Sequence, residues 1–300
     1  MTLQPGEQAT VSVAIATLWN SPDVVRVTDD PALRTPVDIR AWVEGLKEPD
    51  RSGDDPRLDT QLLLGEQVTV DEVRGDWAKV VAVEQPSRAD PRGYPGWLRA
   101  DQLTTDSTGS GVDLVVDATA TAVRDAPFGD ILLYGVAIGT RLTGTGITYR
   151  GWTQILIPGQ REPAWVRTAD VAPAPDGSAS GEDVLEVAER LLDVPYVWGG
   201  VSAYGIDCSG LVHLACRRHG LEIPRDAGDQ AEASKEISVD DAAPGDLYFF
   251  ARPGAGIHHV GIVAGERRMV HASGPRARVV LEPLEGERAE TLTGARRLLS

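Results

Sequence analysis

Short runs of alternating apolar and polar residues dominate the first half of the chain, and they predict β-strands. The runs form one series twice: a strand after a turn glycine, a strand led by Trp, and a Trp strand that closes on a short polar turn. The members of this series are 64–70, 77–80 and 96–103 in the first block, and 138–142, 152–155 and 164–171 in the second. Strands this short and closely spaced are typical of small barrels, so we expect two related β-barrels. The alternative is an unrelated pair of β-rich blocks.

A helical period replaces this alternation in the last third of the chain. Residues 182–193 (EDVLEVAERLLD) and 208–220 carry apolar positions three or four residues apart, and the second segment ends in two Arg and a Gly. The segments 246–250, 259–263 and 268–271 then predict strands. Helices followed by an antiparallel sheet indicate an α+β domain. A short helix is also predicted within 36–46, inside the first block.

Two small, polar stretches without periodicity divide the chain, TTDSTGSG at 104–111 and PAPDGSASGED at 173–183. We therefore expect domains at 1–104, with the helical insertion, at 112–173 and at 181–300. The pattern of the first two blocks resembles bacterial SH3-like domains, which accompany cell-wall hydrolases.

The charge of the chain excludes several classes of partner. Asp and Glu outnumber Lys and Arg by 45 to 29, for a formal net charge of −16. A surface this acidic repels phosphate backbones and anionic lipids, so we expect neither a nucleic acid nor a membrane as partner. No apolar run is long enough to cross a membrane, and the start (MTLQPGE) lacks the pattern of a secretory signal, so we expect a cytoplasmic protein.

Cys208 begins a predicted helix, where unpaired backbone N–H groups and the helix dipole favour a negative charge. We expect this environment to bias its thiol toward the reactive thiolate and to receive an oxyanion. Cys216 lies two turns further on the apolar stripe, which predicts an inert core residue. Eight residues of helix separate the two by ~12 Å, so they do not form a disulfide, and a reducing compartment is expected.

His259 and His271 lie on neighbouring predicted strands among apolar residues. A buried histidine with satisfied hydrogen bonds is the plain interpretation of either one. Together with Cys208 they fit a nucleophile, a base and an orienting group. Strand alternation does not distinguish His258 from His259, because adjacent residues face opposite sides. The Cys and His spacings match no zinc-ligand pattern, so we expect no metal site.

Four motifs in order resemble the NlpC-type cysteine peptidases, over about residues 182–300. They are PYVWGG at 195–200, DCSGLV at 207–212, HHVGI at 258–262 and HA at 271–272. These papain-like enzymes cut peptidoglycan peptides at the γ-D-glutamyl–diamino acid bond. The resemblance implies Cys208 as nucleophile, His259 as general base and acid, and His271 as the group that orients the imidazole. It also implies that Tyr196, Asp207 and Ser209 line the substrate pocket, while His258, His213 and His219 are expected at the surface.

The first block extends the match, since TQLLLGEQVTV at 60–70 and GYPGW at 93–97 resemble the cytoplasmic members that recycle murein peptides. In those enzymes the first SH3-like domain closes one side of the cleft. The resemblance implies that Glu66 and Tyr94 bind the free amine of an N-terminal L-Ala. After Ile-Pro-Arg-Asp at 223–226 this chain has Ala227 where related enzymes often have Ser. Arg225 or Ser209 is expected to replace its contact with the substrate.

The expected fold is thus two small all-β SH3-like barrels followed by an α+β papain-like domain. The expected activity is hydrolysis of free peptides of the form L-Ala-γ-D-Glu-diamino acid by a monomer without a cofactor. Two alternatives stay open: an exported hydrolase that acts on intact wall peptides, and a non-catalytic SH3-like wall-binding protein.

Overall fold

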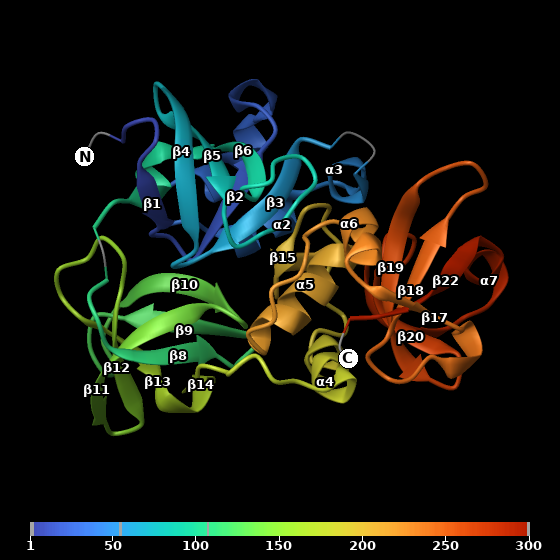
Figure 1. Cartoon of the computed structure of the whole chain (residues 1–300). Coiled ribbons are helices and arrows are strands. Elements are labelled where there is room, and N and C mark those ends of the chain that lie inside the picture. The colour runs from blue at the N-terminus through green and yellow to red at the C-terminus, as the bar shows by residue number, and fades with distance from the viewer. Residues whose placement is uncertain (1–2, 54–55, 107, 299–300) are drawn as a thin grey trace.

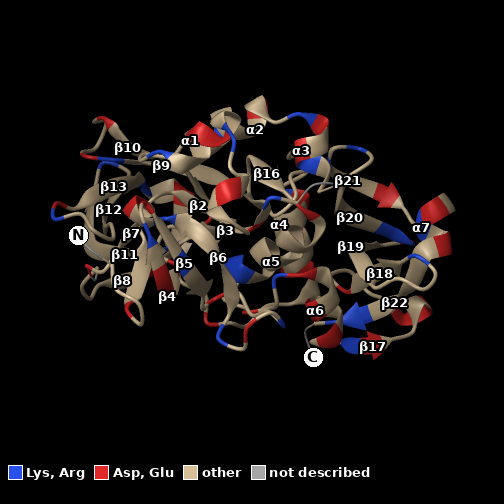
Figure 2. Ribbon diagram, turned by 90° about the horizontal axis from the view of Figure 1, so that it is seen from above, with Lys and Arg blue, Asp and Glu red and all other residues tan. Residues whose placement is uncertain are grey.

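The computed structural model describes residues 3–53, 56–106 and 108–298. In this part of the chain three large β-sheets succeed one another in sequence, and helices pack between the first and the third (Figure 1). Acidic residues are spread over all three sheets and their connections (Figure 2). No helix in the described ranges is long and apolar enough to span a membrane. The expected class, β-domains followed by an α+β domain, is confirmed.

The first sheet contains seven strands in the order β3-β2-β6-β5-β4-β1-β7. Their bounds are β1 Gln8–Val11, β2 Ile15–Trp19, β3 Leu58–Leu63, β4 Gln67–Arg74, β5 Trp77–Ala82, β6 Tyr94–Arg99 and β7 Leu103–Thr104. Between β2 and β3 lie the helices α1 Asp30–Leu33, α2 Ile39–Gly45 and α3 Glu48–Ser52. Helix α2 is the predicted one, and its apolar face buries Ile39, Trp42 and Val43.

The second sheet repeats the first. Its order, β10-β9-β13-β12-β11-β8-β14, is that of the first sheet with each strand number raised by seven. The bounds are β8 Val112–Val116, β9 Ala120–Arg124, β10 Ile131–Ala137, β11 Arg141–Tyr149, β12 Trp152–Leu156, β13 Ala164–Arg167 and β14 Val171–Pro173. The two blocks are therefore copies of one topology, as the recurring Trp pattern predicts. We call the block of β1 to β7 the first barrel and the block of β8 to β14 the second barrel.

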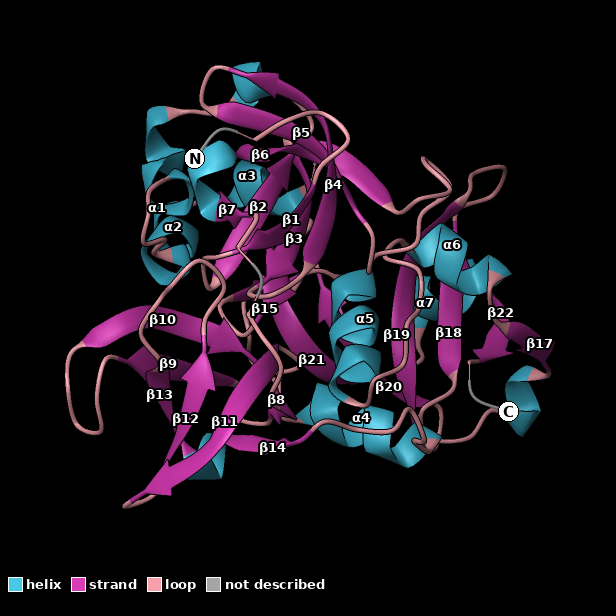
Figure 3. Cartoon of the chain, turned by 60° about the vertical axis from the view of Figure 1, so that its left-hand side comes forward, coloured by secondary structure: helices cyan, strands magenta, loops and turns pink. Residues whose placement is uncertain are grey.

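The third part places helices against a six-stranded antiparallel sheet of order β17-β22-β18-β19-β20-β21. Its helices are α4 Gly181–Glu189, α5 Cys208–Arg218, α6 Ala227–Glu232 and α7 Gly286–Thr291. Its strands are β15 Val201–Ser202 and β16 Gly205–Ile206, which form a separate pair, then β17 Lys235–Ile237, β18 Leu247–Ala251, β19 Ile257–Gly265, β20 Arg268–Ser273, β21 Arg278–Pro283 and β22 Leu292–Arg297. Helices α4 and α5 pack on β19 and β20 (Figure 3).

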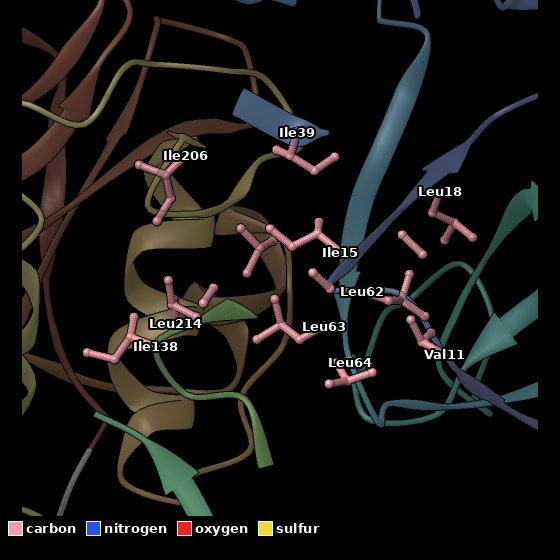
Figure 4. Packing of buried hydrophobic residues seen from close by; sticks show 14 of the residues in the cluster. Val11, Ile15, Leu18, Ile39, Leu62, Leu63, Leu64, Ile138, Ile206 and Leu214 are labelled. Carbon is pink, nitrogen blue, oxygen red and sulfur yellow. The ribbon is translucent and has the colours of Figure 1, made fainter. Parts of the chain in front are cut away.

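One apolar core joins the three parts. In Figure 4, Leu63 of β3 points toward Leu214 of α5, and Ile138 of the second barrel approaches the same helix. Ion pairs reinforce this contact: Arg217 of α5 meets Glu84 of the first barrel, with 3.1 Å between nitrogen and oxygen. The first barrel is therefore fixed against the helix that begins with Cys208.

Candidate active site

The start of α5 is built around a buried aspartate. Asp207 is the N-cap, and its Oδ1 accepts the N–H of Gly210 at 2.6 Å. Its Oδ2 accepts the N–H of Gly199 at 2.7 Å, which holds the preceding turn against the helix. A Cβ added at Gly210 would lie 2.3 Å from the carbonyl oxygen of Gly200, so glycine is required for this close approach. The cap thus fixes the position of Cys208 at the first helical residue.

Three side chains on adjacent strands form a hydrogen-bonded line. His259 of β19 and His271 of β20 meet with 2.8 Å between Nε2 and Nδ1. The other nitrogen of His271, Nε2, lies 3.1 Å from Oε2 of Glu282 on β21. A carboxylate only accepts, so Nε2 of His271 carries the proton and Nδ1 accepts from Nε2–H of His259. The remaining nitrogen of His259, Nδ1, then carries a lone pair.

The thiol of Cys208 meets the strand that carries this base. Its sulfur accepts a hydrogen bond from the backbone N–H of Val260, the residue after His259. Burial and the neighbouring Asp207 carboxylate raise the pKa of Cys208 to about 12, while the backbone hydrogen bonds from Val260 and Ser209 lower it. Burial and the positive charge of Arg288 lower the pKa of His259 well below its ordinary value.

Both shifts favour the neutral forms, a thiol at Cys208 and an imidazole at His259. The expected bias of the Cys208 thiol toward thiolate is wrong in direction, because burial and the Asp207 carboxylate outweigh the effect of the helix N-terminus.

The other histidines and the second cysteine occupy different environments. His258 is exposed at the rim of the cavity beside Cys208, and His219 is also at the surface. His213 is buried, with its Nδ1 3.3 Å from the carbonyl oxygen of Ile223, so the expected surface position is wrong. That face of α5 is covered by the first barrel. Cys216 is fully buried in the core, as predicted.

A cavity of about 350 Å³ opens beside Cys208 and is closed on one side by the first barrel. On the side that the first barrel closes, Asp59 of β3 and Tyr94 of β6 line it together with Asp226, and Arg88 lines it as well; we call the part around the two aspartates its acidic end. The hydroxyl of Tyr94 donates to Oδ2 of Asp226 at 3.0 Å. Desolvation, and then the charge of Asp226, raise the pKa of Asp59 to about 6, although Arg225 lowers it. Two carboxylates that repel each other in a partly dry cavity would be stabilised by a bound cation.

Comparison with known proteins follows the same division of the chain. Residues 193–297 match the profile described as "NlpC/P60 family", and residues 50–103 match "Bacterial dipeptidyl-peptidase Sh3 domain". A protein of Bacillus subtilis named gamma-D-glutamyl-L-lysine dipeptidyl-peptidase is 37% identical over 269 residues, which cover 88% of this chain and 89% of that protein. The chain belongs to the NlpC/P60 family. It is a cysteine peptidase of that family.

Two further relatives match nearly the whole length. A Bacillus cereus protein with the same printed name is 34% identical and covers 97% of this chain and 91% of its own. The crystal structure of an NlpC/P60 family protein from Bacillus cereus has a TM-score of 0.89 and 30% identity, and covers 98% of this chain and 100% of that one. The arrangement of both barrels and the peptidase part is therefore shared with a solved relative of this family.

The structure brings most of the predicted site residues together. His259 and His271 meet in the hydrogen bond described above, and Cys208 contacts the strand that carries His259 through the backbone of Val260. Tyr196, Asp207 and Ser209 line the cavity, and Tyr94 reaches it from the first barrel.

Glu66 is the clearest correction. Its side chain is 1% exposed and does not line the cavity. Its Oε1 accepts the N–H of Leu63 at 3.0 Å, its Oε2 accepts from Gln85 at 3.0 Å, and Arg217 of α5 lies 3.6 Å away. Glu66 therefore fastens the first barrel to α5 and does not bind a substrate amine. The carboxylate that the first barrel does bring to the cavity is that of Asp59, from the preceding strand.

Arg225 is a second correction. The side chain is 0% exposed and lies behind the cavity wall. Its nitrogens bond to the Asp207 carboxylate at 3.0 and 2.8 Å and to the Ser209 hydroxyl at 2.9 Å. The remaining donors reach Thr60 at 2.7 Å and the Gly200 carbonyl at 3.4 Å. All five donors are in use, so Arg225 holds Asp207 and Ser209 in place and cannot replace the hydroxyl that Ala227 lacks.

Sequence reasoning missed Asp59, Asp226 and Glu282. Each is a single acidic residue among many in this acidic chain, and no local spacing distinguishes it. Asp226 directly follows the Arg225 that was considered, and Glu282 lies on the strand next to His271. Only the pairing of strands and the docking of the first barrel bring these residues to the site. In the described part of the chain, no group of three or more His, Cys, Asp and Glu is arranged to hold a metal ion.

Proposed function

We propose that this peptidase hydrolyses the γ-D-glutamyl–L-diamino acid bond of free stem peptides that begin with an unblocked L-Ala. The observation that carries the proposal is the acidic end of the cavity beside Cys208. A dipeptide placed with its scissile carbonyl at the thiol would extend toward Asp59, Tyr94 and Asp226. The relatives named gamma-D-glutamyl-L-lysine dipeptidyl-peptidase support the same bond.

The terminal ammonium is the group that this acidic end suits. Asp59 and Asp226 supply two negative charges, and Tyr94 already holds Asp226 by a hydrogen bond. A peptide whose L-Ala is still amide-linked to a glycan has no ammonium there, so it would leave both carboxylates uncompensated. Such discrimination would fit a role on released peptides, and we propose that the protein recycles them as a cytoplasmic monomer.

The chemistry begins with transfer of the thiol proton of Cys208 to Nδ1 of His259 as the sulfur attacks the carbonyl carbon. The oxyanion accepts hydrogen bonds from the backbone N–H of Cys208 and from the hydroxyl of Tyr196, whose pKa is raised by burial so that it stays protonated. His259 then donates its proton to the leaving amine, and the C–N bond breaks. Water, deprotonated by the same imidazole, releases the dipeptide and restores the thiol.

His271 and Glu282 keep the imidazole in the required tautomer throughout. Hydrogen bonds along the line leave Nδ1 of His259 unprotonated to accept the thiol proton, and Glu282 stabilises the positive charge that forms transiently on the two rings. Arg276 donates to the other oxygen of Glu282 at 2.6 Å and keeps that carboxylate in place.

The test is cleavage of L-Ala-γ-D-Glu-L-Lys and its diaminopimelate counterpart, each with a free and an N-acetylated L-Ala, followed by mass spectrometry. Release of L-Ala-γ-D-Glu from the free-amine peptides alone is the expected result. Equal cleavage of acetylated peptides would contradict amine recognition and favour a hydrolase of intact wall. No cleavage of any peptide would contradict the proposed reaction and favour a non-catalytic wall-binding protein.

A further inference from the structure

Arg288 is a charged residue near the hydrogen-bonded line of His259, His271 and Glu282, which we call the catalytic line. The mechanism above does not use Arg288. It lies in α7, the short helix that precedes β22 at the outer part of the six-stranded sheet (Figure 2). Its guanidinium is 5.5 Å from the ring centre of Phe250. The same Phe250 ring lies 5.5 Å from the ring of His259, its partner across the strand pair. Arg288 is therefore one aromatic ring away from the catalytic base.

The guanidinium of Arg288 is half-buried, and within the described residues it forms neither an ion pair nor a hydrogen bond. Nearly every other arginine near the cleft is engaged, as Arg225 is by Asp207 and Arg276 by Glu282. Partial burial lowers the pKa of Arg288, and the charges of Cys208, Glu287 and Glu282 raise it, although neither carboxylate forms an ion pair with it. A half-buried cation without an anion partner at the edge of an active site is suited to receive one from the substrate.

Arg288 is not among the residues that line the cavity beside Cys208, whereas Asp59, Tyr94 and Asp226 are. Its charge acts on Cys208, Tyr196 and His259. The groups at the acidic end respond mainly to one another and to Arg225. A substrate with its ammonium at Asp59 and its scissile carbonyl at Cys208 would place its leaving residue beyond the thiol, next to the base that protonates it.

We infer that Arg288 binds the α-carboxylate of the diamino acid released by cleavage, and so favours peptides that end at that residue. The inference rests on the proposed function. His259 protonates the leaving nitrogen, and the carboxylate carbon lies two bonds from that nitrogen. A group that binds this carboxylate must therefore flank His259, as Arg288 does. A further residue on the peptide would convert the carboxylate into an amide and remove the charge that Arg288 recognises.

The experiment compares L-Ala-γ-D-Glu-L-Lys with the same peptide carrying a C-terminal carboxamide. We expect the wild-type protein to prefer the free acid by about tenfold in kcat/KM, the lower range for a charge-assisted hydrogen bond. In Arg288→Gln the preference should fall toward one, and Arg288→Lys should keep part of it. Arg252→Gln is the matched control, because Arg252 is exposed beside His258 and is expected to retain the full preference.

The outcomes separate a binding role from the alternatives. If Arg288→Gln lowers kcat/KM equally on both peptides and keeps the tenfold preference, the inference is overturned. Such a result would show an effect on the thiol, the imidazole or the fold. A wild-type protein that cuts acid and carboxamide equally would also overturn it, while leaving the proposed function intact. If neither peptide is cut, the proposed function fails first, and this inference fails with it.

Discussion

Replacement of Asp59 by Asn tests the acidic end of the cavity most directly. The change removes one negative charge but keeps the size of the side chain, so the β3 strand that carries it is preserved. An ammonium bound by a partly buried carboxylate gains about 2 kcal/mol from a charge-assisted hydrogen bond, which corresponds to roughly 30-fold in affinity. We expect Asp59→Asn to raise KM for the free-amine peptide by about this factor and to leave kcat nearly unchanged, because Asp59 touches no reacting atom.

The raised pKa of Asp59 adds a pH dependence with a definite sign. The carboxylate binds the ammonium only when ionised, and its pKa in the free protein is about 6. Binding therefore weakens as the pH falls through 6, and kcat/KM should be about tenfold lower at about pH 5 than at about pH 7. Burial and the charge of Arg288 lower the pKa of His259 well below its ordinary value, so protonation of its imidazole is displaced to lower pH, and Asp59→Asn separates the two effects.

The assay is the initial rate of L-Ala-γ-D-Glu release over this pH range, with free-amine and N-acetylated peptides. Asp59→Asn should lose the acid limb near pH 6 and should discriminate less between the two peptides. Asp76→Asn is a matched control, because that carboxylate is exposed in the same barrel and 3.4 Å from Arg99. The reasoning is refuted if Asp59→Asn lowers kcat and leaves KM and the acid limb unchanged.

The remaining predictions concern the nucleophile, the catalytic line and the barrel contact. Cys208→Ala should abolish hydrolysis while the peptide still binds, and iodoacetamide should label Cys208 and not Cys216; turnover near the wild-type rate would exclude Cys208 as nucleophile. Glu282→Ala should lower kcat by about 10- to 100-fold with little change in KM, as for other residues that orient a catalytic imidazole; a change confined to KM would contradict this role. Glu66→Ala should lower the free energy of unfolding by about 3 kcal/mol, because it leaves Arg217 with one buried partner fewer. The midpoint of thermal unfolding measures this loss of stability. An unchanged midpoint with a raised KM would restore the amine-binding role that the sequence suggested.

The sequence by itself determined the features that depend on neighbouring residues. The doubled Trp pattern determined two barrels of one topology, because each strand and turn is encoded locally and the same code recurs. The cap of α5 is equally local, since Asp207 and Gly210 lie within one turn of Cys208. The order of the motifs then pointed to the nucleophile and the histidines.

Only the tertiary structure decided what the charged side chains do. Glu66 and Asp59 lie in the same stretch, yet one is sealed against Arg217 and the other opens into the cavity. The pKa of Cys208 was likewise predicted in the wrong direction, because burial beside Asp207 outweighs the helix terminus. The physical reason is that charge and burial act through space: a carboxylate binds whichever cation the fold brings near it, and the sequence does not state that distance.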